Sequence, residues 1–454
     1  MKNIYKTVSL ASLIISACVK CALAQIVVPP NQMVTDTTYK SIAGKKSGED
    51  DQISTNLIAG NNKAIFESDA HFTFEVKNAT ATTETGKVSY TVFKEDGEPL
   101  KSDSVKITIP KKSTGRYAFN IPESKPGFYK INFMVNVSDY DDTTRRAFGI
   151  RPQEIQSPNN KPVDFELFWQ NAKAELATIA PDFKVTPAPD KDTENCNVYL
   201  IEMNSLDNVR IRGWMTVPKK QNKHKKFAVL LALPGYQVDL DPITGEDPDV
   251  AFITLNTRGQ GNSRDQINTR HDEFIARHIE DKDRYVMRGV IMDCIRCVDF
   301  ICSRPELNHN QIFVKGGSMG AYLALATASL DNRISLCSAQ SPILCDVRNL
   351  KGRVEFPIKN INRYLDTQPG LSWNKILDNL DYFDGKTFAQ NIRCKVIMSI
   401  GLVDNYAPPS NEYITFNNIS APKRILVFKD LGHDVSPLYL KLESAWMHDE
   451  FALF

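Results

Sequence analysis

One serine, held between glycines at a turn from an apolar strand into an alanine-rich helix, constrains this chain most. The segment reads Gln311-Ile312-Phe313-Val314-Lys315-Gly316-Gly317-Ser318-Met319-Gly320, and an Ala-rich stretch follows over 321–330. A serine at such a turn has a strained backbone, and side chains at Gly316 or Gly320 would collide with the adjoining strand and helix. The pattern is typical of a nucleophile elbow. For this segment alone, a plain tight turn is the alternative.

An acid and a histidine follow the serine in the order that an α/β-hydrolase fold requires. An apolar run over 394–400 predicts a buried parallel strand, and Asp404 lies on the loop after it. The next predicted strand, 424–428, leads to His433 on the equivalent loop. The order Ser318, Asp404, His433 is that of a catalytic triad on this fold. Asp404 could instead cap the helix that follows it.

Histidines are too few to offer many alternatives. His448 is the only other one after Asp404, and it falls in a predicted terminal helix, 437–454, where a surface or packing role is expected. The remaining five precede the serine and break the order: His71, His224, His271, His278 and His309.

The length of the chain and its amino-terminal sequence indicate how many domains to expect and where the protein is sent. A chain of 454 residues exceeds what one core usually organises, so two domains are expected. Lys2 and Lys6, an apolar run over 8–19 and Ala22-Leu23-Ala24 predict a signal peptide over 1–24, which is too short to be a membrane span. We expect an exported protein, periplasmic or secreted. Processing at Cys18 into a lipid anchor is the alternative.

Charge and cysteines exclude several classes of protein. The formal net charge is +1 with both signs interspersed, which gives no reason to expect a nucleic-acid partner. Cys294 and Cys297 resemble a CxxC pair, but they lie in a helical run, 285–303, with no second pair at metal spacing, so we expect buried apolar side chains and no metal. Seven cysteines remain after the signal, an odd number that does not indicate a disulfide framework: 196, 294, 297, 302, 337, 345 and 394.

Two hydrophobic periods divide the mature chain. Between 70 and 150 apolar residues alternate with polar ones, which predicts a small immunoglobulin-like β-sandwich in a domain over 25–152. A Pro-rich linker over 153–163 precedes an α/β domain, 164–454, in which short apolar strands alternate with helices around a mostly parallel sheet. An insertion over 348–383 is expected to form a lid or a wall of the acyl pocket.

The assembled residues resemble the acetyl xylan esterase and cephalosporin-C deacetylase family, the seventh of the carbohydrate esterase families. The likeness covers about 164–454. It is carried, besides the elbow, by these motifs: Asp164-Phe165 with Phe168-Trp169, Pro234-Gly235-Tyr236, Arg258-Gly259-Gln260, Asp281-Lys282-Asp283-Arg284-Tyr285 with Arg288-Gly289, Gly401-Leu402-Val403-Asp404 with Pro408-Pro409, and Gly432-His433.

The resemblance implies an esterase that removes acetyl groups from short xylo-oligosaccharides and other small acetylated compounds, without a metal or an organic cofactor. It implies an oxyanion hole in which the backbone N–H of Tyr236 joins that of Met319, with Gly235 beside it. Arg258, Gly259 and Gln260 are expected to support the loops beneath the site. Ring-like homo-oligomers are common in the family.

Three positions depart from the family pattern. Pro234 stands where a histidine is usual, Met319 where a glutamine follows the nucleophile, and Asp434 where a glutamate follows the histidine. The chemistry should survive, because Met319 keeps its backbone N–H. We expect Met319 and Pro234 to line or flank the acyl site and remove polar groups from it. The sandwich lies outside the family's minimal architecture, which leaves the ring assembly open.

Two other functions fit parts of the pattern. A serine peptidase of the prolyl-oligopeptidase type shares the triad order, but about 125 residues of sandwich cannot supply a propeller with blades of roughly 40 to 50 residues. A catalytically silent carbohydrate-binding protein could keep the fold, although an intact triad argues against it.

Overall fold

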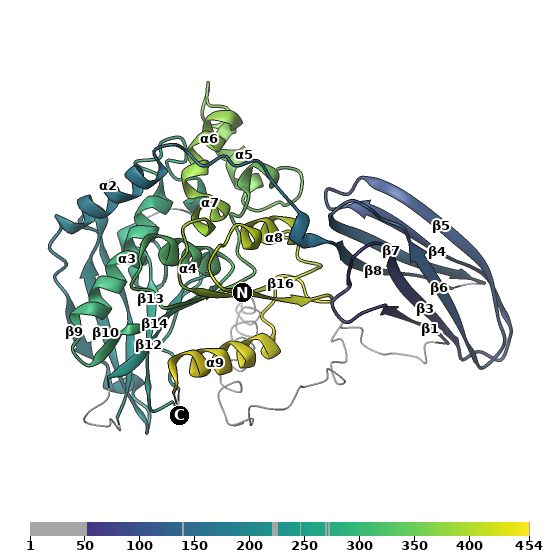
Figure 1. Ribbon diagram of the computed structural model, residues 1–454, viewed down its shortest axis with the longest axis horizontal. Helices are drawn as coiled ribbons and strands as arrows, with labels where there is room; N and C mark the ends of the chain where they lie inside the picture. Colours follow the sequence, from purple (N-terminus) through teal and green to yellow (C-terminus); the bar gives the residue numbers. More distant parts are fainter. Residues whose placement is uncertain are drawn as a thin grey trace, which may run out of the picture.

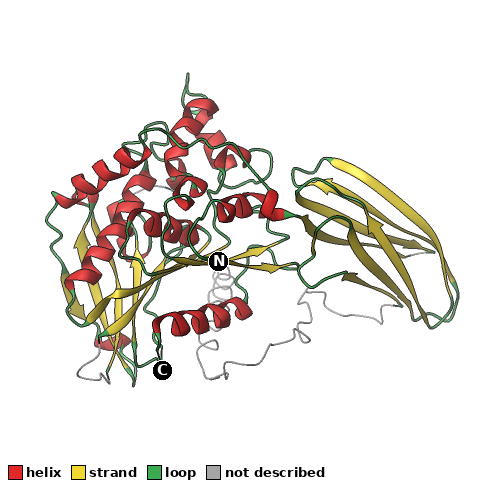
Figure 2. Cartoon of the chain, in the orientation of Figure 1, coloured by secondary structure: helices red, strands yellow, loops and turns green. Residues whose placement is uncertain are grey.

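The chain forms an amino-terminal β-sandwich and a larger α/β domain, seen in the computed structural model (Figure 1; Figure 2). The structure describes residues 52–138, 140–219, 226–245, 247–267, 270 and 273–453. The expected signal peptide and lipidation site, with residues 25–51 of the expected sandwich domain, lie outside the described residues. The sheet topology agrees with the predicted fold class.

Two sheets make up the sandwich. One has the order β1-β3-β6 and the other β2-β8-β7-β4-β5. Alternate residues of these strands point inward, as the period of two predicts, and phenylalanines 72, 74, 133 and 148 fill the core. The strands are β1 Ile53–Ala59, β2 Ile65–Phe66, β3 Ala70–Asn78, β4 Glu84–Lys94, β5 Pro99–Ile109, β6 Ser113–Ile121, β7 Gly127–Val137 and β8 Tyr140–Ile150.

A nine-stranded sheet organises the α/β domain in the order β17-β16-β15-β14-β12-β13-β11-β10-β9. Strands from β13 to β17 pair in parallel, and β11, β10 and β9 add an antiparallel edge. The strands are β9 Lys184–Pro187, β10 Cys196–Asn204, β11 Arg210–Pro218, β12 Phe227–Leu233, β13 Val250–Asn256, β14 Leu307–Gly317, β15 Leu336–Gln340, β16 Lys395–Gly401 and β17 Lys423–Phe428. Buried strands such as β12 are apolar throughout because helices cover both faces.

Helices lie on both sides of this sheet (Figure 1), with α9 on the face opposite α3 and α4. Met447 and Phe451 of α9 pack on Leu230 and Phe313 of the sheet. The helices are α2 Phe165–Ala177, α3 Val286–Ser303, α4 Met319–Leu330, α5 Ile358–Asp366, α6 Trp373–Leu380, α7 Gly385–Ala389, α8 Pro409–Asn417 and α9 Pro437–Phe451. Short 3-10 turns occur at Pro152–Glu154, Pro189–Lys191, Leu206–Asn208, Gly261–Gln266, Phe274–Ala276, Val347–Asn349 and Asp381–Phe383.

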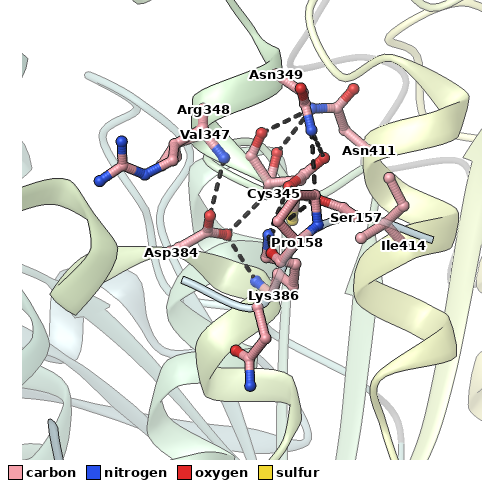
Figure 3. A network of polar contacts seen from close by, with 12 residues as sticks. Ser157, Pro158, Cys345, Val347, Arg348, Asn349, Asp384, Lys386, Asn411 and Ile414 are labelled. Carbon is pink, nitrogen blue, oxygen red and sulfur yellow. Dashed lines mark hydrogen bonds and ion pairs between the residues drawn. The ribbon is translucent and has the colours of Figure 1, made fainter. Parts of the chain in front are cut away.

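The segment between the domains is fastened to the α/β domain (Figure 3). The ammonium group of Lys386 donates to Ser157 Oγ at 3.0 Å and to the Pro158 carbonyl at 2.9 Å, and it pairs with Asp346 Oδ1 at 2.7 Å. Both charged side chains of this pair are buried. Burial raises the pKa of the neighbouring Asp384 to about 6, partly offset by the charge of Lys386. The Pro-rich segment 152–163 is therefore bound to the α/β domain, and we call this segment the strap.

Apolar packing also joins the two domains. Ile400, Leu402 and Tyr413 of the α/β domain belong to the same buried cluster as the sandwich core. The rings of Phe128 and Tyr413 lie 5.4 Å apart. At the edge of this contact Arg146 Nε pairs with Asp430 Oδ1 at 3.0 Å. The sandwich is thus packed on β16 and α8, which are the elements next to Asp404.

The remaining sequence expectations concern cysteines, metals and membranes. The seven cysteines of the described part are free thiols, and Cys294 and Cys297 are buried as predicted. Within the described ranges, no group of three His, Cys, Asp or Glu side chains is placed to hold a metal ion. No helix in the described part of the chain has the length and apolar character needed to cross a membrane.

Candidate active site

Ser318 lies at the turn between β14 and α4 with φ 58° and ψ −120°. This backbone conformation is strained for a residue with a side chain. The glycines around it have steric causes, because a Cβ at Gly316 would lie 2.3 Å from the Gly320 carbonyl carbon, and one at Gly320 would lie 2.3 Å from the Leu233 carbonyl oxygen. The N–H of Ser318 donates to the Gln340 carbonyl at 2.9 Å, which fixes the turn to β15.

The structure brings Ser318, His433 and Asp404 into one hydrogen-bonded chain. His433 Nε2 lies 2.8 Å from Ser318 Oγ, and His433 Nδ1 lies 2.7 Å from Asp404 Oδ2. The other oxygen, Asp404 Oδ1, accepts the backbone N–H groups of Tyr406 at 2.7 Å and Ala407 at 2.9 Å. The Asp404 side chain is fully buried. This arrangement can take a proton from the serine hydroxyl and stabilise the resulting imidazolium.

The turn after β12, which carries Tyr236, abuts the elbow, which carries Met319. A Cβ at Gly235 would lie 3.7 Å from the Gly317 carbonyl oxygen, so the two turns lie close together. Met319 is the first residue of α4, where a backbone N–H has no acceptor within the helix. The Tyr236 ring packs on Phe356 at 4.7 Å, so the 348–383 insertion forms a wall beside this turn.

Gln260 and Arg258 support the site from behind. Gln260 Oε1 accepts the N–H of Gln237 at 2.6 Å, which holds the turn after β12 in place. Arg258 is buried and forms a bidentate pair with Asp293, at 3.0 Å from Nε and 2.8 Å from Nη2. A Cβ at Gly289 would lie 2.2 Å from Arg258 Nη1, so that glycine makes room for the guanidinium. The positive φ of Gly259, 77°, turns the chain between them.

Met319 and Pro234 flank the turns that meet at Ser318, but the structure does not support the expectation that their side chains line the acyl site. The Met319 side chain is fully buried in the core, and Pro234 is buried as well. Neither side chain lines an open acyl site, because α4 packs directly on the sheet and turns the Met319 side chain inward. Asp434, the third departure, is exposed and contributes its backbone carbonyl to Gln340 Nε2 at 3.1 Å. His448 lies elsewhere, with Nε2 2.5 Å from Asp247 Oδ2.

Three exposed apolar side chains lie on the loops that carry the expected site residues, and we call these three the rim; sequence reasoning did not identify them. Val238, Tyr406 and Val435 are 45%, 53% and 56% exposed. Each follows an expected site residue by two positions, namely Tyr236, Asp404 and His433 in turn. The Tyr406 ring lies 5.2 Å from the His433 ring. The sequence signal that could have identified these residues is their position two residues after an expected site residue, because loops at this edge of the sheet carry the site.

A buried serine–histidine–carboxylate chain at the carboxyl edge of a mostly parallel sheet defines a serine hydrolase of the α/β-hydrolase fold. The acetyl xylan esterase (AXE1) family model matches residues 152–449. The chain therefore belongs to the acetyl xylan esterase family, and it is a hydrolase of carboxylic ester bonds. The match begins after the last strand of the sandwich.

Individual relatives agree with this assignment. The chain is similar to the acetyl esterase Axe7A of Xylanibacter ruminicola, with 27% identity over 320 residues, 67% of this chain and 70% of that protein. The structure of an acetyl xylan esterase from Paenibacillus sp. R4 matches with TM-score 0.61 and 28% identity, covering 66% of this chain and 98% of that one. Acetyl xylan esterase 1 from Thermoanaerobacterium sp. JW/SL YS485, at 22% identity, TM-score 0.58 and the same coverage, supports the fold.

Proposed function

We propose that the protein removes acetyl groups from acetylated xylo-oligosaccharides and similar small acetyl esters. Ser318 is the nucleophile, His433 the general base and Asp404 the carboxylate that orients the imidazole. The observation that carries the proposal is the hydrogen-bonded chain from Ser318 through His433 to Asp404 in a member of the acetyl xylan esterase family. The family match favours neither a peptidase nor a silent binding protein.

The reaction follows from the positions of these atoms. Ser318 Oγ attacks the acetyl carbonyl carbon while its proton passes to His433 Nε2, and the carbonyl oxygen becomes an oxyanion. The N–H groups of Met319 and Tyr236 stabilise that oxyanion. His433 then returns the proton to the departing sugar oxygen, which leaves an acetyl-serine. Water attacks this ester with His433 again as base, and acetate is released.

The rim supports a sugar as the leaving group. A pyranose ring has a face of C–H bonds, and aromatic and aliphatic side chains bury such a face favourably. Tyr406 offers an exposed ring beside His433, where the departing sugar oxygen must receive its proton. Val238 and Val435 extend the apolar rim on the two neighbouring loops.

The direct test is acetate release by wild type and by Ser318→Ala from 4-nitrophenyl acetate, acetylated xylo-oligosaccharides and cephalosporin C. We expect release by wild type and its loss in the variant, because Ser318 carries the hydroxyl that is hydrogen-bonded to His433. Equal release by both proteins would remove Ser318 as nucleophile. Inertness of both, with retention on xylan, would favour the binding protein, and turnover of aminoacyl amides alone would favour the peptidase.

We also propose that residues 1–24 direct export and are removed, so that the mature enzyme is periplasmic or secreted. The charged and apolar pattern of this segment supports the proposal. Mass spectrometry of the mature amino terminus tests it, since Gln25 and a lipidated Cys18 give different masses. The homo-oligomer implied by the resemblance remains a prediction, which light scattering of the purified protein tests.

A further inference from the structure

A glutamate of the sandwich is buried at the amino terminus of the helix that follows the triad acid. Glu95 lies in the turn between β4 and β5 and is only 9% exposed. Its Oε1 accepts the backbone N–H of Ser410 at 3.1 Å, and its Oε2 pairs with Arg353 Nη1 at 3.2 Å. Both carboxyl oxygens of this sandwich residue therefore form hydrogen bonds with the α/β domain.

The helix α8 needs this contact because its own sequence cannot provide it. Its cap residue is Pro408 and its first residue is Pro409, and the cap makes no side-chain hydrogen bond. A cap residue normally accepts the N–H of the second or third helical residue, and proline has no side-chain oxygen to do so. Ser410 is that second residue, so the Glu95 carboxylate performs the capping from the sandwich. Burial raises the pKa of Glu95, and the hydrogen bond from Ser410 and the charge of Arg353 oppose that rise.

The capped end of α8 is rigidly connected to the triad. Only the segment 405–409 separates Asp404 from Ser410, and it ends in two prolines whose φ angles are fixed. Asp404 Oδ1 is held by N–H groups within that segment. Arg353 fixes the same end a second time, because its Nη1 also lies 3.3 Å from Asn411 Oδ1. Asn411 in turn donates to the Cys345 and Asp346 carbonyls, both at 3.0 Å.

We propose that the sandwich is part of the catalytic apparatus, with Glu95 as a positioning residue that caps α8 and thereby fixes the loop carrying Asp404. The inference rests on the proposed function for the roles of Asp404 and His433. The sandwich then contributes to the active site of the other domain, because the buried Glu95 carboxyl binds Ser410, and Ser410 directly follows the loop that begins at Asp404. Removal of this carboxylate lets the loop relax, and a small displacement of Asp404 weakens the hold on the imidazole.

The test compares Glu95→Ala, which removes both contacts, with Glu95→Gln, which keeps an oxygen for the Ser410 N–H and removes the charge. The control is Glu98→Ala in the same turn, where the carboxylate is 60% exposed and pairs only with Lys94 in the described structure. The readouts are kcat and KM on 4-nitrophenyl acetate, their pH profile, and the rate at which a fluorophosphonate labels Ser318. Thermal midpoints are recorded for every variant.

We expect Glu95→Ala to lower kcat and the labelling rate by about 10- to 100-fold, with KM changed less than about threefold, because misplacement of a catalytic group costs up to about 100-fold. The acid limb of the kcat/KM profile moves to lower pH, since the imidazolium loses part of its carboxylate partner. Glu95→Gln should fall between Glu95→Ala and wild type, and Glu98→Ala should match wild type.

A lower thermal midpoint with unchanged labelling rate and pH profile would overturn the proposal and leave Glu95 as an interface contact. Should Glu95→Ala fail to fold, the same comparison is made with Glu95→Gln. The labelling rate separates this inference from the proposed function, because it reports activation of Ser318 whether or not acetylated sugars are substrates.

Discussion

At the scale of single residues, Asp404 is the best-determined member of the candidate triad. One of its oxygens receives two backbone N–H groups, and the other faces His433 Nδ1. The carboxylate therefore has one orientation available, and that orientation fixes the imidazole so that Nε2 faces Ser318.

Asp404→Asn tests this orientation. The amide keeps the shape of the carboxylate but presents an N–H to the imidazole or to the loop, which favours the wrong tautomer, so we expect kcat to fall about 10⁴-fold with little change in KM. Steady-state kinetics on 4-nitrophenyl acetate measure it. Asp434→Asn is the matched control, because that exposed side chain follows His433 directly and should change kcat less than about threefold. A comparable fall in kcat for Asp434→Asn would argue against Asp404 as the carboxylate that orients His433.

Tyr406→Ala tests the rim as a platform for sugars. Loss of an aromatic stacking partner costs about 0.5 to 1.5 kcal/mol, so kcat/KM on acetylated xylo-oligosaccharides should fall up to about tenfold. On 4-nitrophenyl acetate, which carries no sugar, activity should change less than about twofold. Tyr406→Phe keeps the ring and should resemble wild type. Equal losses on both substrates would instead indicate that the substitution disturbs the loop after Asp404.

Sequence alone located the three triad residues because the order and spacing of strands and loops determine them. It could not show that the side chains of Met319 and Pro234 are buried, although Met319 directly follows Ser318 and Pro234 lies two positions before Tyr236. Which way a side chain points at the start of a helix depends on how that helix packs on the sheet. The exposure of Tyr406 has the same tertiary origin.

At the scale of elements, α8 contains a buried acid for which the structure provides no partner. Glu412 is fully buried, and neither carboxylate oxygen has a hydrogen-bond partner among the described residues. Burial, with the charges of Asp404 and Glu95 adding to it, raises the pKa of Glu412 well above its usual range. The folded protein therefore binds the Glu412 proton more tightly than the unfolded chain does, and the buried carboxyl without a partner costs stability.

Glu412→Leu should raise the free energy of unfolding by about 1 to 3 kcal/mol, the usual cost of a buried unsatisfied polar group. The gain depends on pH, because above about pH 4.3 the unfolded chain releases the Glu412 proton while the folded protein retains it. Stability of the wild type thus falls as pH rises toward the raised pKa, and leucine removes that loss. Denaturant unfolding at pH 5 and pH 8 should show the larger gain at pH 8. Glu98→Leu, at an exposed position, should show neither effect, and a destabilised Glu412→Leu would refute the account.

Most elements of the α/β domain could be predicted because their signals are local. Strand β17 ends at the predicted residue, 428, and α3 begins one residue after the predicted start. The capping of α8 could not be predicted, because its partner lies more than three hundred positions away in another domain. Contacts of that kind leave no periodic trace in the sequence around either residue.

At the scale of the whole molecule, the two domains are joined by buried charges as well as apolar packing. The polar, Pro-rich strap reads as a free linker in the sequence, yet its Ser157 and Pro158 contact a buried ion pair (Figure 3). Asn417 of α8 binds the strap again, donating to the Pro152 and Ile155 carbonyls at 3.0 and 3.1 Å. The relative position of sandwich and α/β domain is thus fixed along the whole connection.

Lys386→Met tests this fastening. The substitution keeps the length of the side chain but leaves the buried Asp346 without its cation, and breaking a buried pair costs about 3 to 5 kcal/mol. The loss should be larger at pH 8 than at pH 5. The Lys386 charge opposes the rise that burial causes in the pKa of Asp384, so its removal raises that pKa further above about 6 in the folded protein, whereas the unfolded chain releases the Asp384 proton above about pH 4. Thermal unfolding at the two pH values measures the difference. Lys395→Met removes a pair with Glu450 whose lysine is half exposed, and it should cost at most about 1 kcal/mol at either pH. If Lys386→Met were as mild as that control, the strap would be held by its apolar and backbone contacts alone.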